Sequence, residues 1–134
     1  MTRLLTLGCG LLLGLIALLV AARRIFDVVE VEGASMAPAL RSGDRLLVEA
    51  LTYRSRPPRV GDLVLAADPR LPSRELIKRV AALDPAARTA SLAGDAPEMS
   101  TDSRVFGPIP LSAIRWRVVG RYWPITRQMP LPIS

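Results

Sequence analysis

The feature that most constrains this chain is an uncharged apolar run of 19 residues, Leu4 to Ala22. As a helix with a rise of about 1.5 Å per residue, the run would be roughly 28 Å long, close to the ~30 Å hydrocarbon core of a bilayer. Arg3 precedes the run and Arg23-Arg24 follow it, so the positive-inside rule gives no orientation. We therefore predict a single-pass membrane anchor over residues 1–24, with membrane lipid as a partner.

A cleavable signal peptide is the alternative interpretation of the same run. Val20-Ala21-Ala22 resembles the small-residue pattern that precedes a cleavage site. The run is longer than the roughly 7–15 apolar residues that are usual in signal peptides, and we therefore favour a retained anchor.

The 110 residues that follow the anchor are enough for one modest hydrophobic core. Short stretches rich in apolar and β-branched residues alternate there with turns that contain Gly, Pro and Asp. No stretch shows a convincing helical pattern. The predicted fold is mainly β, a small antiparallel barrel or a set of twisted sheets, over residues 25–124 and followed by a C-terminal tail at 125–134. The predicted strands cover residues 26–32, 45–51, 63–67, 75–83, 89–93 and 114–123, and the predicted loops include 54–62, 68–73 and 94–104.

The net charge of +6 comes from arginines spread along the chain, and aromatic residues make up only 4% of it. This favours a solvated basic surface over a nucleic-acid site, which would need a basic patch or a stacking platform. The single cysteine, Cys9, excludes an intrachain disulfide and a cysteine-based zinc cluster. We expect no nucleic-acid partner.

Ser35 lies between small residues just ahead of Pro38, and it is a candidate nucleophile. The chain has no histidine, which excludes a Ser-His-Asp triad, so the base for a serine would be a lysine or a carboxylate. The chain holds 17 arginines but one lysine, Lys78, and only a lysine can become neutral in a protein. Strand alternation puts Lys78 on one face with Leu76 and Val80, an apolar setting that would lower its pKa. The plainer alternatives are a serine in a turn and a surface lysine.

The segment Ser100 to Arg104 offers two hydroxyls, a carboxylate and a guanidinium within five residues. A serine there could hydrogen-bond the lysine amine and orient it, while Asp102 and Arg104 could pair and fix the loop. An exposed turn is the alternative.

Several stretches, taken in order, resemble the motifs of the type I signal peptidases, which are membrane proteases with a Ser-Lys dyad. The resemblance covers roughly Val28 to Gly120, and no large second β domain fits into the 15 residues between Lys78 and Gly94. Within this family, the likeness is strongest to the nickel-type superoxide dismutase maturation proteases, on the runs Arg56–Asp62 and Ser100–Ile109. The stretches that carry the family resemblance are Ser35–Leu40, Gly43–Val48, Gly61–Leu65, Ile77–Val80, Gly94-Asp95 and Ser100–Ile109.

The resemblance implies that Ser35 attacks the scissile carbonyl, that Lys78 is the general base and that Ser100 orients its amine. It further implies that Asp102 and Arg104 support the loop behind the lysine. The substrate would bind as an added strand along Val29–Ala34 and Glu75–Lys78, with small side chains at the first and third positions before the cut. The substrate-binding residues would include Gly33, Ala34, Met36 and Ile77, and no metal or organic cofactor is implied.

The chain departs from the family pattern in three places. Gly33 stands where some members have a serine that donates to the oxyanion, and Ala96 stands where an asparagine is usual. Leu83-Asp84-Pro85 replaces a Pro-Gly-Asp turn. The function expected from the resemblance is removal of an N-terminal leader from a precursor protein at the cell membrane. The alternatives are general signal peptide cleavage and an inactive, membrane-tethered module that binds peptides.

Overall fold

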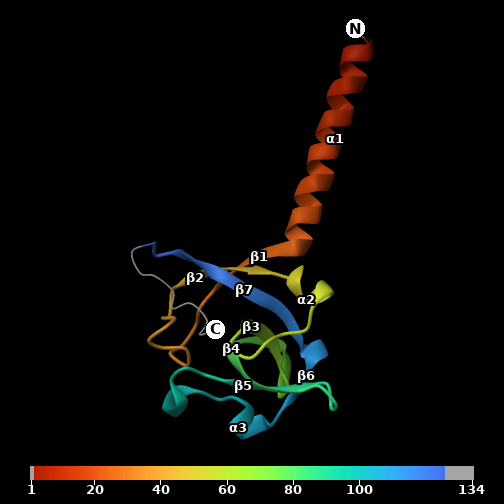
Figure 1. Ribbon diagram of the computed structural model, residues 1–134. Helices are drawn as coiled ribbons and strands as arrows, with labels where there is room; N and C mark the ends of the chain where they lie inside the picture. The colour runs from red at the N-terminus through yellow and green to blue at the C-terminus, as the bar shows by residue number, and fades with distance from the viewer. Residues whose placement is uncertain (1, 126–134) are drawn as a thin grey trace.

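The structure is a computed structural model that describes residues 2–125, with side chains from residue 6 onward. Helix α1 (Thr2–Ile25) projects away from the rest of the molecule (Figure 1). Its segment Thr6–Ile25 has the length, the mean hydropathy of 2.0 and the few charges that a membrane span requires, and none of it is buried. Apart from Ile125, the predicted C-terminal tail lies outside the described residues.

The remainder of the described chain is built on one antiparallel sheet of seven strands. The mainly β, antiparallel fold is as the sequence predicts, but the sequence analysis found only six of the strands and missed the two-residue strand at Ile109–Pro110. The order of the strands across the sheet is β1-β2-β7-β3-β4-β5-β6, so β7, near the end of the described chain, pairs between β2 and β3. The strands are β1 (Phe26–Glu30), β2 (Arg45–Glu49), β3 (Leu63–Asp68), β4 (Leu71–Asp84), β5 (Thr89–Ala93), β6 (Ile109–Pro110) and β7 (Ile114–Trp123).

Strand β4 starts earlier than the sequence predicts, and the expected loop at residues 68–73 is wrong. The Asp68 carboxylate accepts a hydrogen bond from the Arg70 backbone N–H at 2.9 Å and pairs with the Arg70 guanidinium at 2.8 Å, which stabilises a tight turn. Pro72 is tolerated because the register shifts there: Asp68 pairs with Leu71 and Ala67 with Glu75, so residues 72–74 bulge from the ladder.

Four short helical segments interrupt the strands, and the sequence interpretation contained none of them. Two are α-helical turns that carboxylates stabilise: Glu49 accepts from the backbone N–H of Leu51 and Thr52, and Asp102 accepts from that of Arg104. A four-residue turn is too short to show a helical hydrophobic period. The segments are α2 (Thr52–Ser55), η1 (Pro97–Met99), α3 (Ser103–Phe106) and η2 (Leu111–Ala113).

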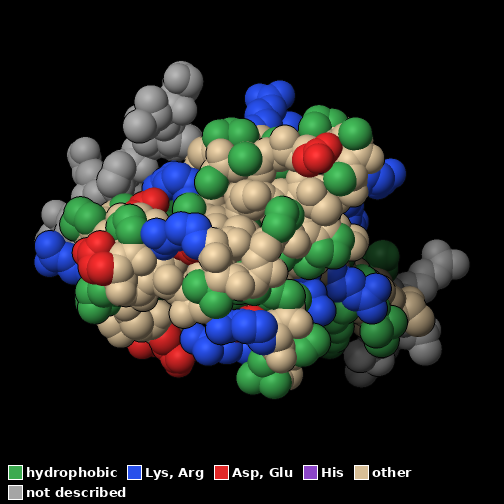
Figure 2. Space-filling model, turned by 90° about the horizontal axis from the view of Figure 1, so that it is seen from below, with side chains coloured by type: hydrophobic (Ala, Val, Ile, Leu, Met, Phe, Trp, Pro, Cys, Tyr) green, Lys and Arg blue, Asp and Glu red, His purple; other side chains and the backbone are tan. Residues whose placement is uncertain are grey.

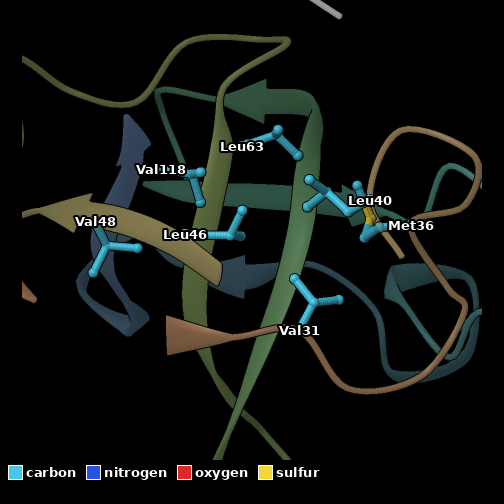
Figure 3. Close-up of a cluster of buried hydrophobic side chains, with 7 residues drawn as sticks. All are labelled: Val31, Met36, Leu40, Leu46, Val48, Leu63 and Val118. Carbon is cyan, nitrogen blue, oxygen red and sulfur yellow. The ribbon is translucent and has the colours of Figure 1, made fainter. Parts of the chain in front are cut away.

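Two clusters of buried side chains form the core. The first joins β2, β3 and β7 to the segment after β1, and Met36 and Leu40 anchor that segment with 2% and 0% of their surface exposed (Figure 3). The second lies between β3, β4, β5 and the end of the sheet at β6. Because the first cluster holds the residues on both sides of Ser35, it fixes the segment that carries this serine.

On the surface remote from α1, charged side chains of one sign are not clustered. Figure 2 shows basic side chains there scattered among acidic and apolar ones, with no single block of one sign. This arrangement agrees with the expectation that the net charge of +6 marks a solvated surface.

Candidate active site

The segment after β1 turns sharply and presents Ser35 next to the sheet. The turn is tied at its base, since Val31 N–H donates to the Asp44 carbonyl at 2.8 Å and Gly43 N–H donates to the Val31 carbonyl at 2.9 Å. Gly33 has φ +81°, a conformation that favours glycine over any other residue. This explains why a glycine occupies the position where some signal peptidases have a serine: here, a side chain would strain the backbone.

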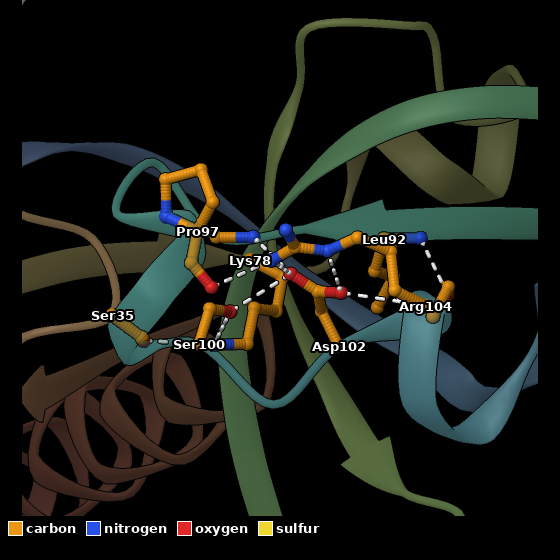
Figure 4. A network of polar contacts seen from close by, with 9 residues as sticks. Ser35, Lys78, Leu92, Pro97, Ser100, Asp102 and Arg104 are labelled. Atoms are coloured by element: carbon orange, nitrogen blue, oxygen red, sulfur yellow. Dashed lines mark hydrogen bonds and ion pairs between the residues drawn. The ribbon is translucent and has the colours of Figure 1, made fainter.

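Lys78 lies on β4 with its amine directed at Ser35. Its Nζ donates to Ser35 Oγ at 2.7 Å and to Ser100 Oγ at 3.1 Å (Figure 4). Leu76, Lys78 and Val80 are all buried, as the alternation predicts, and the lysine is 3% exposed. The fold thus brings the only lysine of the chain into contact with the candidate nucleophile, 43 positions away.

Burial of Lys78 lowers the pKa of its amine below the ordinary value of 10.5, because desolvation penalises the charged form. The Asp102 carboxylate opposes this shift and raises the pKa, while the positive charges of Arg74 and Arg104 lower it further. The net direction is downward, which increases the fraction of neutral amine at a given pH.

Asp102 is fully buried and connects the loop to the lysine. Its Oδ2 accepts from Ser100 Oγ and from Gly94 N–H, both at 2.9 Å. Arg104 donates Nε to Oδ1 at 2.9 Å and Nη2 to Oδ2 at 2.8 Å, and this guanidinium is the main reason why the pKa of Asp102 is strongly depressed. The carboxylate therefore stays ionised and holds Ser100 in contact with Lys78. Arg104 also donates to the Pro97 carbonyl, and Ser103 Oγ accepts from Leu92 N–H, contacts that fix both ends of the loop (Figure 4).

Gly94 is a site residue whose role the sequence interpretation missed. A Cβ at this position would overlap the Ser100 hydroxyl, well inside van der Waals contact, and would lie 2.6 Å from the Ser35 carbonyl oxygen. The next residue but one, Ala96, donates its backbone N–H to the same Ser35 carbonyl at 2.9 Å. The sequence singled out Gly94 and Ala96 as parts of a motif, but only the fold shows that this backbone packs directly against both serines.

We expect Gly94→Ala to lower kcat by at least about a hundredfold, because the methyl group would push Ser35 and Ser100 away from Lys78 and small displacements of reacting groups are costly. Peptide cleavage assays on the purified full chain measure this loss. Gly120→Ala is the matched control, since no heavy atom lies within 4 Å of a Cβ there. Equal kcat values for the two variants would contradict the packing argument.

An ion pair on the opposite face of β4 also supports the site, and the sequence interpretation did not anticipate it. Arg79 donates Nε and Nη2 to the two carboxylate oxygens of Asp95 at 2.9 and 2.8 Å, and Nη1 to the Gly61 carbonyl at 3.0 Å. Asp95 lies between Gly94 and Ala96, so this bidentate contact fixes the backbone that packs on Ser35. Strand alternation predicted that Arg79 lies on the face opposite Lys78, but it could not predict the ion pair with Asp95.

A cleft of about 550 Å³ leads to the dyad. One wall is the continuous segment from Val29 to Met36 and the other is the β4 segment from Arg74 to Lys78. All four residues that the resemblance implies for substrate binding line the cleft: Gly33, Ala34, Met36 and Ile77. Among residues 2–125, the backbone N–H of Ser35 has no hydrogen-bond acceptor, so it is free to donate to a ligand in the cleft.

Comparison with known proteins identifies the family. The pattern of the family "Signal peptidase, peptidase S26" matches residues 4–87. The mitochondrial ATP-independent inner membrane protease subunit 1a of Arabidopsis thaliana is 37% identical over 126 residues, which cover 78% of this chain and 75% of the relative. The mitochondrial inner membrane protease subunit 1 of Xenopus tropicalis is 34% identical over 128 residues, covering 82% and 77%.

A bacterial relative has the same character: the probable signal peptidase I-1 of Synechocystis is 38% identical over 79 residues, which cover 52% of this chain and 40% of the relative. None of these three names is that of a nickel superoxide dismutase maturation protease, the subfamily that the sequence runs suggested. The family resemblance drawn from the motifs is confirmed, and the chain belongs to the signal peptidase family, peptidase S26.

Proposed function

We propose that this protein is a membrane-anchored serine endopeptidase that removes an N-terminal leader from a precursor protein, with Ser35 as nucleophile and Lys78 as general base. The observation that carries the proposal is the 2.7 Å contact between Lys78 Nζ and Ser35 Oγ, made by a lysine that is 3% exposed. A hydroxyl becomes a useful nucleophile when a neighbouring base takes its proton, and a buried amine with a lowered pKa is such a base.

In the first step, neutral Lys78 accepts the Ser35 hydroxyl proton while Oγ bonds to the scissile carbonyl carbon. The resulting oxyanion lies near the free Ser35 N–H, which is suited to stabilise it. The C–N bond then breaks, Lys78 passes its proton to the departing amine, and the leader stays bound to Ser35 as an ester. A water molecule, deprotonated by Lys78, attacks the ester carbonyl; the bond to Oγ breaks, Lys78 returns the proton to Ser35 Oγ, and the leader leaves with a free carboxylate.

The other members of the site act as positioning residues in this proposal. Ser100 contacts the amine at 3.1 Å and thereby keeps it directed at Ser35. Asp102 holds Ser100, and Arg104 keeps Asp102 ionised through two hydrogen bonds. This is the third-group role that a nucleophile–base pair requires.

The leader binds in the cleft as an extended strand between the two walls, in contact with Gly33, Ala34, Met36 and Ile77. Strand addition supplies backbone hydrogen bonds that are independent of the side chains of the leader.

Helix α1 is the anchor in this proposal, within residues 1–24, and places the catalytic domain, residues 25–124, at the surface of a cell membrane. Strand β1 begins at Phe26, the residue after the helix ends, so little chain separates the domain from the bilayer. The two mitochondrial relatives are inner membrane proteases by name, which supports a membrane location.

The proposed protease has two candidate substrates. Maturation of a nickel-type superoxide dismutase rests on the sequence runs Arg56–Asp62 and Ser100–Ile109 and on the small size of the domain. General removal of signal peptides rests on the bacterial relative named a probable signal peptidase. An inactive peptide-binding module is disfavoured because Ser35 and Ser100 are both present and both contact Lys78.

N-terminal proteomics on cells that carry either wild type or Ser35→Ala tests these alternatives. Retention of the leader by one nickel superoxide dismutase alone would identify a dedicated maturation protease. Retention by many exported proteins would identify a general signal peptidase. No change at any N-terminus would contradict the proposed proteolysis and favour the binding module.

The proposed base predicts how activity depends on pH. Because Lys78 must be neutral, kcat/KM should rise about tenfold per pH unit on the acid side and level off above the lysine pKa. The lowered pKa places this plateau below the 10.5 of an ordinary lysine. Initial rates with one peptide, corrected for the stability of the enzyme at each pH, measure the profile. A rate that falls as pH rises through the neutral range would contradict a lysine base.

A further inference from the structure

The charged residues that line the cleft differ in whether the protein itself neutralises them. Arg70 pairs with Asp68 at 2.8 Å, Glu75 with Arg115 at 3.7 Å and Glu30 with Arg45 at 3.8 Å. Arg74, which also lines the cleft, makes no hydrogen bond or ion pair with any residue from 2 to 125. It is therefore the one arginine of the cleft whose guanidinium remains available to a ligand.

The backbone around Arg74 is also distinctive. It is the last residue of the bulge at 72–74, directly before Glu75 resumes pairing with β3. Bulges commonly redirect a side chain beside an active site. The Arg74 side chain is exposed, and its charge is close enough to Lys78 to act on the pKa of that amine. The bulge thus places in the cleft, on the approach to the dyad, a cation that has no ion pair among the described side chains, although its charge also acts on the Asp68 carboxylate that Arg70 holds.

The spacing along β4 indicates which part of a bound strand Arg74 would meet. Four residues at about 3.3 Å each separate it from Lys78 by roughly 13 Å along the strand. A peptide strand added beside β4 has the same rise, so the facing residue lies about four positions from the scissile bond. The two walls extend from the dyad along Val29–Ser35 and Arg74–Lys78. The leader lies along these segments if the proposed function is correct, so this residue precedes the cut.

We infer that Arg74 is a specificity-determining residue that binds a carboxylate side chain of the leader, three to five residues before the cleavage site. A guanidinium forms paired hydrogen bonds with a carboxylate, which gives geometric selection as well as charge attraction. Arg74 is solvent-exposed, so the contribution is modest, about three- to fivefold in affinity or kcat/KM.

The test uses the full chain in zwitterionic phosphatidylcholine vesicles and a set of peptides with alanine at the first and third positions before the cut. A single Asp is moved through positions two to seven before the cut, and each peptide has an Asn counterpart. Cleavage is measured with wild type and Arg74→Gln, and binding is measured with the same peptides on Ser35→Ala with and without Arg74→Gln. Arg59→Gln, an exposed arginine outside the cleft, controls for net charge.

The expected result is an Asp-over-Asn preference of about three- to fivefold, confined to positions three to five, present in wild type and Arg59→Gln and absent in Arg74→Gln. Arg74→Glu should reverse it and prefer Lys at the same position. A preference that survives Arg74→Gln, or that is equal at all positions, would overturn the inference. If phosphatidylglycerol stimulates wild type but not Arg74→Gln while the peptide preferences stay the same, Arg74 contacts lipid headgroups instead and the inference is wrong.

The two measurements separate this inference from the proposed function. Ser35-dependent cleavage without an acid preference would overturn the inference alone. An Arg74-dependent acid preference in binding, with no cleavage by wild type, would overturn the proposed proteolysis and leave the binding site. If no peptide is bound and none is cleaved, the inference about Arg74 and the proposed proteolysis are both contradicted.

Discussion

Ser35→Ala should reduce peptide cleavage by at least about a thousandfold, because the variant lacks the oxygen that forms the acyl bond. The residual rate would come only from binding and from stabilisation of the oxyanion by the backbone N–H. The fold should survive, since the change removes one hydroxyl whose side-chain hydrogen bond is with Lys78. Assays of kcat/KM and of thermal unfolding on the purified full chain measure both parts of this prediction.

Ser42→Ala is the matched control, because Ser42 is an exposed serine in the turn after the same segment. It should retain the wild-type rate and the wild-type melting temperature. Cleavage at the wild-type rate by Ser35→Ala would show that another nucleophile acts and would end the proposed mechanism. A large loss of thermal stability would instead mean that Ser35 is needed for folding, and binding to an uncleaved peptide would then decide its role.

The pairing of Ser35 with Lys78 could be anticipated because few residue types remained. Without histidine, and with the one cysteine in an apolar run, a serine nucleophile needed a lysine or a carboxylate, and the chain has only one lysine. Alternation then predicted that Lys78 is buried between Leu76 and Val80, which the structure bears out. The motif order added Ser100, Asp102 and Arg104, and the structure brings these into one chain of contacts with the dyad.

What could not be anticipated are contacts between backbone and side chains that are distant in sequence. Gly94 is required by its distance to Ser35 and Ser100, and a sequence does not show which atoms surround a glycine. Likewise, alternation gave the face of Arg79 but not its ion pair with Asp95. The alternation of apolar and polar residues determines which side of a strand is buried. The contact partners of a side chain depend instead on how the loops cross the sheet.

The mistaken loop at residues 68–73 has a related cause. Pro72 and the polar residues around it favour a loop by local preference, but the Asp68–Arg70 contact closes a tight turn and the bulge removes the need for a ladder hydrogen bond at the proline. The carboxylate that makes the turn possible acts over two residues, too short a range for hydrophobic periodicity to reveal.

Lys78→Arg should be as inactive as Ser35→Ala, with a loss of at least about a thousandfold at every pH that the protein tolerates. A guanidinium stays protonated in proteins, so it cannot accept the Ser35 proton even though it keeps the charge and the hydrogen-bonding capacity of the protonated lysine. The substitution therefore distinguishes a base from a cation that merely stabilises the oxyanion. The measurement is kcat/KM across the pH profile, with the acid limb of wild type as reference.

Lys78→Met is the companion variant, because it keeps the length of the side chain and removes the amine. It should also be inactive, yet it should be at least as stable as wild type, since it replaces a buried amine whose charged form burial penalises. Lys78→Arg, with a larger and permanently charged group at a position only 3% exposed, should melt at a lower temperature. Substantial activity of a folded Lys78→Arg protein would mean that a group other than the amine in contact with Ser35 takes its proton, and the Ser-Lys mechanism would be wrong.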